Sequence, residues 1–212
     1  MIAQGREAGG HGLHPEQGCG TLPLARRVVQ LVKEDEEEEE KRPLVLAAGG
    51  IVDGAGAAAS LVLGCDAAVL GTRLWATHQA MGNLEKKRDL VTASADDAVR
   101  TRTYDQINNK VQKETANGIL WRYPYDTCGV IWKDDENATT NSNVPAWHEE
   151  AFAKLAVKEW STEDCKSYVD RSFTLAGEGV GSISTLMDGE DVVKVISQGI
   201  AKEIRRVNNL LV

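Results

Sequence analysis

The stretch from Leu44 to Trp75 most constrains what this chain can fold into. It contains two short apolar runs, Leu44–Ala48 and Ala67–Leu70, and each run is followed directly by glycine. Between them lies an alanine-rich segment that Asp53 can cap at its start, while Gly64 suits the position after its end. The order of strand, helix and strand predicts a βαβ unit.

Both predicted strands are apolar throughout, which is typical of a parallel sheet that helices cover on both faces. Their ends carry the turns Gly49-Gly50 and Gly71-Thr72, whose backbone N–H groups can bind an anion. Two such turns on adjacent strands can share one phosphate, as the loops after strands seven and eight do in (β/α)8 barrels. Arg73 would add positive charge there or would be a solvated side chain.

A second glycine-rich segment comes near the start of the chain. Ile2-Ala3 has the character of a strand end, and four glycines follow between Gly5 and Gly12. Such a loop can bring its backbone close to a ligand, and the alternative is a plain flexible loop.

Helices are predicted on either side of these segments. The first covers Thr21–Val32, with Thr21 as the N-cap and Pro23 in the first turn, and its apolar stripe comprises Leu24, Val28, Leu31 and Val32. The last begins at about Asp191, and its inward stripe comprises Val192, Ile196, Ile200, Ile204, Val207 and Leu211.

The region between is predicted to be helical or irregular. Residues 75–111 are expected to be mostly helical and residues 108–143 irregular. Ala146–Trp160 is expected to be a helix, followed by a capping box of Ser161 and Asp164. Ala176–Ile183 is a third glycine-rich loop.

Charge and cysteine content exclude several classes of function. The net charge of −8 comes from the acidic run Glu34–Glu40, without which 25 acids face 24 bases. The run is expected to be a solvated loop or a frayed end of the helix before it. No basic face for nucleic acid, no apolar span of about 20 residues and no signal peptide is found. The four distant cysteines match no metal site and indicate reduced thiols, hence a cytoplasmic protein without a metal.

Four glycine-rich blocks together resemble the nitronate monooxygenase family, formerly called 2-nitropropane dioxygenases. The blocks are AQGREAGGHG at 3–12, AAGGIVDG at 47–54, LGCDAAVLGTR at 63–73 and AGEGVGSI at 176–183. The segment VRTRTYDQ at 99–106 is similar to the fungal-type branch. The resemblance covers nearly the whole chain, and the acidic run departs from it as an insertion at 34–42.

The resemblance implies an α/β fold, a (β/α)8 TIM barrel that binds FMN and carries a mainly helical region. Mapped onto it, Ile2-Ala3 ends strand six, and the two apolar runs are strands seven and eight. The chain would then be the C-terminal portion of an incomplete barrel, since such a barrel takes about 250 residues. The implied divisions are 1–95 for the barrel, 96–175 for the helical or irregular region and 176–212 for the flavin-proximal loop and last helix.

The resemblance also assigns site residues. His11 corresponds to the active-site histidine, as a base or hydrogen-bond partner of the substrate, whereas alone it would be an exposed loop histidine. The residues expected to hold FMN are Gln4, Gly9, Gly10, Gly49, Gly50, Leu70, Gly71 and Thr72.

The activity that the resemblance implies is oxidative denitrification of a nitronate or nitroalkane by FMN and O2, which gives a carbonyl compound and nitrite. A flavin-dependent enoyl-thioester reductase of the same barrel type is an alternative. A third reading is a catalytically inactive or partner-binding piece, because three strands cannot close a barrel. In that case the chain is expected to be poorly soluble or free of flavin unless it pairs with another chain.

Overall fold

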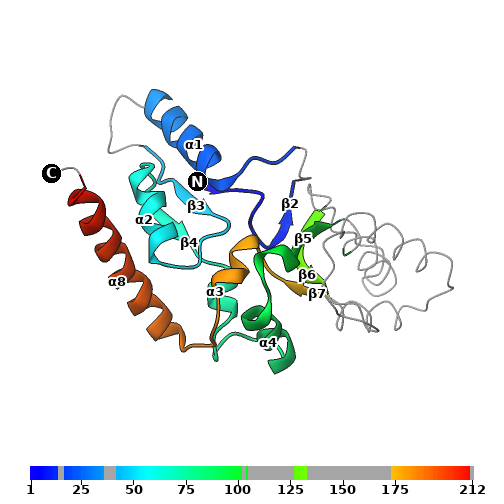
Figure 1. The fold of residues 1–212 in the computed structure, drawn as a ribbon. Helices are drawn as coiled ribbons and strands as arrows, with labels where there is room; N and C mark the ends of the chain where they lie inside the picture. Colours follow the sequence, from blue (N-terminus) through cyan, green and yellow to red (C-terminus); the bar gives the residue numbers. More distant parts are fainter. Residues whose placement is uncertain (14–16, 36–41, 102–103, 105–126, 133–172, 211–212) are drawn as a thin grey trace.

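The structure is a computed structural model that describes residues 1–13, 17–35, 42–101, 104, 127–132 and 173–210. A parallel sheet of three strands lies at its centre, with helices packed against it (Figure 1). The strands are β1 (Ile2–Gln4), β3 (Leu46–Ala48) and β4 (Ala67–Val69), and β3 is the middle one. The fold is therefore α/β, as predicted.

The predicted βαβ unit is confirmed. β3 and β4 pair in parallel, and Gly54–Val62 forms the helix α2 between them. Asp53 caps this helix by accepting a hydrogen bond from the N–H of Gly56 at 2.8 Å. Gly64 follows the helix with a φ of +97°, the left-handed conformation that suits its position.

Burial differs between the two strands of this unit. Ala47 and Ala48 of β3 are buried, whereas all three residues of β4 are half-buried. The prediction that both strands are fully buried is wrong for β4, because β4 forms an edge of the three-stranded sheet. β1 pairs with β3 in parallel, which confirms the strand end at Ile2-Ala3.

The first helix, α1 (Thr21–Asp35), is close to its prediction, but two details were wrong. Thr21 is not the N-cap; it is the first helical residue, and its N–H and hydroxyl donate to the carboxylate of Glu7. Of the predicted stripe, Val32 is buried and Leu24 and Val28 pack half-buried against the core, but Leu31 is exposed, and Ala25 and Val29 are buried in addition.

The last helix, α8 (Gly189–Asn208), runs along α2, as Figure 1 shows in red and cyan. The two helices touch through glycine, since a Cβ on Gly54 would lie 2.4 Å from the Cα of Gly199. Val192 and Ile196 are buried as predicted, but Ile204 is exposed. The inward stripe therefore ends earlier than the sequence period indicates, because α2 is only nine residues long. Val207 is exposed too, and Leu211 lies outside the described residues.

A second, antiparallel sheet of four strands lies beside the first (Figure 1). Its central strand β6 (Thr127–Trp132) pairs with β2 (Gly10–Gly12), β5 (Ala98–Thr101) and β7 (Phe173–Leu175). None of the four strands was predicted, because each is short and glycine or polar residues interrupt its apolar pattern.

The structure agrees with only some of the predictions for residues 75–175. In the described part of 75–111, helix is found at the end of α3 (Thr72–Trp75), at α4 (Leu84–Thr92), in the 3-10 turn Ala95–Asp97 and at Tyr104. Residues 76–83 form mostly turns and bends, and β5 follows the 3-10 turn. The predicted helix Ala146–Trp160 and the capping box of Ser161 and Asp164 lie outside the described residues. The domain boundaries remain predictions.

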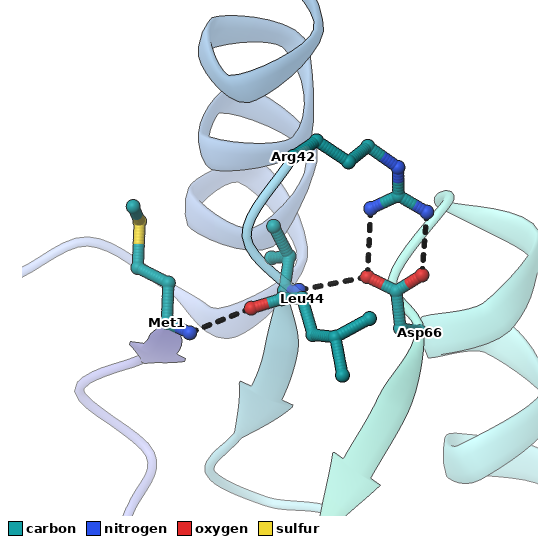
Figure 2. Close-up of polar contacts among 5 residues, drawn as sticks. Met1, Arg42, Leu44 and Asp66 are labelled. Atoms are coloured by element: carbon teal, nitrogen blue, oxygen red, sulfur yellow. Dashed lines mark hydrogen bonds and ion pairs between the residues drawn. The ribbon is translucent and has the colours of Figure 1, made fainter. Parts of the chain in front are cut away.

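An ion pair links the amino ends of the parallel strands (Figure 2). Arg42 donates two hydrogen bonds to the carboxylate of Asp66, at 2.6 and 2.9 Å, and the N–H of Val45 donates a third at 2.7 Å. The terminal ammonium of Met1 donates to the carbonyl oxygen of Leu44 at 2.6 Å. The hydrogen bonds from Arg42 and Val45 lower the pKa of Asp66 to about 2.

This lowered pKa predicts an acid-sensitive contribution to stability. The Asp66 carboxylate stabilises the fold above the pKa of an unfolded aspartate, about 3.9, and this contribution disappears as the pH falls to about 2. We expect Asp66→Asn to cost about 1–2 kcal/mol at neutral pH, a value reduced for partial solvent exposure of the pair. Urea unfolding at pH 7 and pH 3 checks this, with the exposed Asp96→Asn as the control. Equal losses at both pH values would contradict it.

No helix in the described ranges is both long and apolar enough to cross a membrane.

Candidate functional site

A cavity of about 280 Å³ opens at the carboxyl ends of the three parallel strands. The last residue of each strand, Gln4, Ala48 and Val69, contributes to its wall. Ligands of open and closed α/β sheets bind at this end of the strands. The other residues of the wall are Ala8, Gly9, Gly10, Gly49, Gly50, Ile51, Val52, Gly71, Thr72, Trp75, Leu175 and Gly179.

The two strand-end turns meet in this cavity, as the sequence predicts. Gly49 and Gly50 follow β3 with φ values of +114° and +68°, which side chains other than that of glycine rarely adopt. Gly71 follows β4, and a Cβ there would meet no atom within 4 Å. Within the described chain, the N–H groups of Gly49, Gly50 and Gly71 donate to no protein acceptor. These groups can therefore bind an anion.

Thr72 adds a hydroxyl to the same wall. Its Oγ1 accepts a hydrogen bond from the N–H of Gly177 at 3.0 Å, so the hydroxyl proton can be donated to another group. Leu70, also expected to contribute its backbone here, does not belong to the cavity wall in the described chain.

The third glycine-rich block, at 176–183, packs backbone to backbone on the other two. A Cβ on Gly177 would lie 2.3 Å from the carbonyl oxygen of Glu7, and a Cβ on Gly179 would lie 2.7 Å from that of Gly50. The N–H of Glu178 donates to the carbonyl oxygen of Glu7 at 2.9 Å. Glycine is therefore required in this block because the neighbouring backbone leaves no room for a side chain.

His11 lies next to the cavity without belonging to its wall in the described chain. It lies in β2, where its backbone pairs with that of Cys128. Its half-buried ring packs edge to face against the ring of Tyr104, with the two ring centroids 6.2 Å apart. The side-chain amide of Gln4 donates to the backbone carbonyl oxygen of His11 at 3.1 Å. Gln4 thus joins the cavity wall to the strand that carries the histidine.

Arg73 takes neither of the two roles considered for it. Its side chain is buried, and one guanidinium nitrogen donates to the carbonyl oxygens of Ala76 at 2.8 Å and Thr185 at 3.0 Å. Burial lowers the pKa of Arg73. The residue fixes the loop before α8 and supplies no charge to the cavity wall.

Several residues of the site escaped sequence reasoning. Trp75 and Leu175 line the cavity although neither stands in a glycine-rich motif. Arg100 reaches the loop of residues 6–10 from β5, a contact that only the pairing of distant strands creates. Its place in the 99–106 segment was the only available signal.

The site contains no candidate metal cluster in the ranges that the structure describes, where no three His, Cys, Asp or Glu side chains converge. What converges instead is backbone N–H groups, one hydroxyl and apolar side chains. Such a wall suits an organic ligand that carries an anionic group.

Solved structures share this fold. FabK from Thermotoga maritima matches 99% of the chain with a TM-score of 0.64 and 20% identity, over 56% of its own length. Nitroalkane oxidase from Streptomyces ansochromogenes matches 97% of the chain with a TM-score of 0.62 and 23% identity, over 52% of its own length.

Sequence comparison identifies the family. The nitronate monooxygenase npaC of Metarhizium robertsii is 32% identical over 199 residues, which cover 92% of this chain and 50% of that protein. The chain thus spans about half the length of the curated relative that it matches. The model of the nitronate monooxygenase family matches residues 1–199. The chain therefore belongs to the nitronate monooxygenase family.

Proposed function

We propose that this chain contributes the phosphate-binding part of an FMN site to a nitronate-oxidising flavoenzyme. The observation that carries the proposal is the convergence of unpaired N–H groups from Gly49, Gly50 and Gly71 on one cavity. A phosphate can accept hydrogen bonds from all of them and from the Thr72 hydroxyl. Family membership supports the choice of a flavin over other phosphorylated ligands.

The three parallel strands would then belong to a (β/α)8 barrel, with β1, β3 and β4 as strands six, seven and eight. Their pairing order, β1-β3-β4, matches consecutive barrel strands joined by helices. The fold shared with FabK and nitroalkane oxidase, each about twice as long as the match, supports this assignment. The outer edges of β1 and β4 have no partner strand in the described chain and would take the remaining strands.

The flavin would supply the redox chemistry, by taking an electron from a nitronate before O2 completes the reaction. The chain's own part is to bind and orient. Gln4 and the backbone of Gly9 and Gly10 would lie beside the flavin ring, because they line the same cavity and belong to the segment that leads to His11. His11, which Gln4 contacts, would bind the substrate or hold its proton.

Titration of the purified chain with FMN and with riboflavin tests the cofactor assignment. We expect quenching of FMN fluorescence at lower ligand concentration than that of riboflavin, since only FMN carries the phosphate. Oxidation of propionate 3-nitronate, followed as nitrite release, tests the reaction. We expect His11→Ala to lower turnover about 100-fold or more, within the range for a lost acid–base group, without changing FMN affinity.

Either of two experimental results would assign a different function to the chain. Turnover of an enoyl thioester with NAD(P)H, and not of a nitronate, would make the chain a reductase of the same barrel type. Absence of FMN binding would identify a catalytically inactive piece that needs another chain. Adding a separately produced N-terminal half of a related enzyme distinguishes that last case, because restored binding would show that the cavity was only incomplete.

A further inference from the structure

Arg100 holds the glycine-rich loop that forms one wall of the cavity. Its Nε donates to the carbonyl oxygen of Arg6 at 3.1 Å and its Nη1 to that of Gly10 at 3.2 Å. Its Nη2 donates to the carbonyl oxygen of Ala8. One side chain from β5 thus binds three alternate carbonyl groups of a loop about ninety residues earlier in the chain.

The surrounding strands leave space for this guanidinium. A Cβ on Gly12 would lie 2.7 Å from Nη1. A Cβ on Gly129 would lie 2.6 Å from the carbonyl oxygen of Ala8 and 3.2 Å from Nη2. Gly129 is the residue paired with both Arg100 and Gly10. A side chain at position 12 would displace the guanidinium, and a side chain at position 129 would displace the Ala8 carbonyl oxygen that the guanidinium binds. Glycine at both positions is therefore consistent with the contacts of Arg100.

The chemistry of arginine fits this arrangement. Its planar guanidinium carries five N–H donors in a fixed geometry, whereas a lysine ammonium at the same place could not reach three separated carbonyl oxygens. Burial lowers the pKa of Arg100, and the neighbouring Cys128, Glu178 and Glu7 side chains oppose that shift. The side chain nevertheless remains protonated at any pH at which the protein folds.

Binding of these carbonyl groups also fixes the peptide planes of the loop. In a trans peptide the C=O of one residue and the N–H of the next point in opposite directions. Because the oxygen of Ala8 faces Arg100, the N–H of Gly9 faces away from it, and Gly9 lines the cavity. Rotation of that peptide would exchange the positions of a donor and an acceptor in a loop that lines the cavity.

We propose that Arg100 is a positioning residue, which holds residues 6–10 in the conformation that binds the flavin ring without touching the ligand itself. Binding of the flavin ring by this loop rests on the proposed function, whereas the contacts of Arg100 with the loop do not.

Hydrogen exchange of the flavin-free chain tests the hold on the loop. In Arg100→Lys and Arg100→Met we expect the amides of residues 6–12 to exchange at least about tenfold faster. Loss of a single charge-assisted hydrogen bond is enough for an effect of this size. Amides of α1 should exchange at the unchanged rate. If circular dichroism shows that Arg100→Met does not fold, the exchange rates of Arg100→Lys alone test the proposal.

FMN titration and chemical rescue test the consequence for the ligand. Arg100→Lys should raise the FMN dissociation constant about tenfold or more. Arg100→Ala leaves a guanidinium-sized space between Gly12 and Gly129, so free guanidinium ion, below the concentration that unfolds the protein, should restore affinity.

The matched control is Arg42→Met, which removes the bidentate arginine at the opposite end of the strands. It should lower stability without faster exchange in residues 6–12 and without weaker FMN binding. Unchanged loop exchange in Arg100→Lys would overturn the proposal. If the wild-type chain binds no FMN, the proposed function fails, and the exchange experiment still decides the role of Arg100.

Discussion

Gly71→Asp is expected to abolish FMN binding while leaving the fold intact. Gly71 lines the cavity at the end of β4, its φ is −94°, and a Cβ there would meet no protein atom within 4 Å. A negative φ of this size is accessible to residues other than glycine. The substitution therefore places a carboxylate beside the proposed phosphate site without straining the protein.

The expected size of the effect follows from Coulomb's law. Two unit charges about 5 Å apart repel by about 3 kcal/mol at an effective dielectric constant of about 20, which corresponds to more than about 100-fold in affinity. Fluorescence titration measures the FMN dissociation constant, and thermal unfolding checks that the fold persists. The repulsion should decrease in high salt.

Two comparisons separate charge from size in this experiment. Gly71→Asn has nearly the shape of aspartate and no charge, so it should weaken FMN binding much less. Riboflavin lacks the phosphate, so the aspartate should affect its binding no more than the asparagine does. Equal effects of both variants on both ligands would show that no phosphate binds at this strand end.

Gly177→Ala is expected to cost about 2–3 kcal/mol of stability and to weaken FMN binding, although it adds one methyl group. Its φ of −99° is ordinary, so the cost comes from space and not from backbone strain. The new Cβ would lie 2.3 Å from the carbonyl oxygen of Glu7 and 2.7 Å from the nitrogen of Gly9. Both are backbone atoms, which cannot move aside as the end of a side chain can.

The displacement would reach the cavity by two routes. The N–H of Gly177 donates to the Thr72 hydroxyl, and the loop of Glu7 to Gly9 forms the adjoining wall. Urea unfolding measures the free energy of unfolding. Titration with FMN measures the dissociation constant and so reports on the cavity. Gly189→Ala is the control, because a Cβ there meets only the end of the Gln79 side chain at 3.9 Å. A Gly177→Ala protein within about 0.5 kcal/mol of wild type would contradict the close packing described for this block.

Part of the candidate site was predictable from the sequence. Gly49, Gly50, Gly71 and Thr72 directly follow apolar runs, whereas Gln4, Gly9 and Gly10 came from the family resemblance. Seven of the eight residues expected to hold FMN line the cavity: Gln4, Gly9, Gly10, Gly49, Gly50, Gly71 and Thr72. Their predicted role remains a prediction until a ligand is bound. Leu70 is the exception.

The antiparallel sheet was not predictable in the same way. β2, β5, β6 and β7 are three to six residues long and come from distant parts of the chain. Such strands are stable only when they pair with other strands, so no local sequence pattern predicts them. The helix stripes were misjudged for a related reason, since Leu31 and Ile204 have the correct helical spacing but no element among the described residues covers them.

The sequence by itself determined the βαβ unit from Leu46 to Val69, its helix caps at Asp53 and Gly64, and the family. These follow from short-range patterns, because a strand, a helix and a turn each leave their period and cap residues in adjacent positions. Tertiary structure alone decided that Glu7 caps α1, that Gly177 binds Thr72 and that Arg100 holds the loop of residues 6–10. Each of these contacts joins segments that only the folded chain brings together, and backbone groups supply at least one side of each, so side-chain identity could not reveal them.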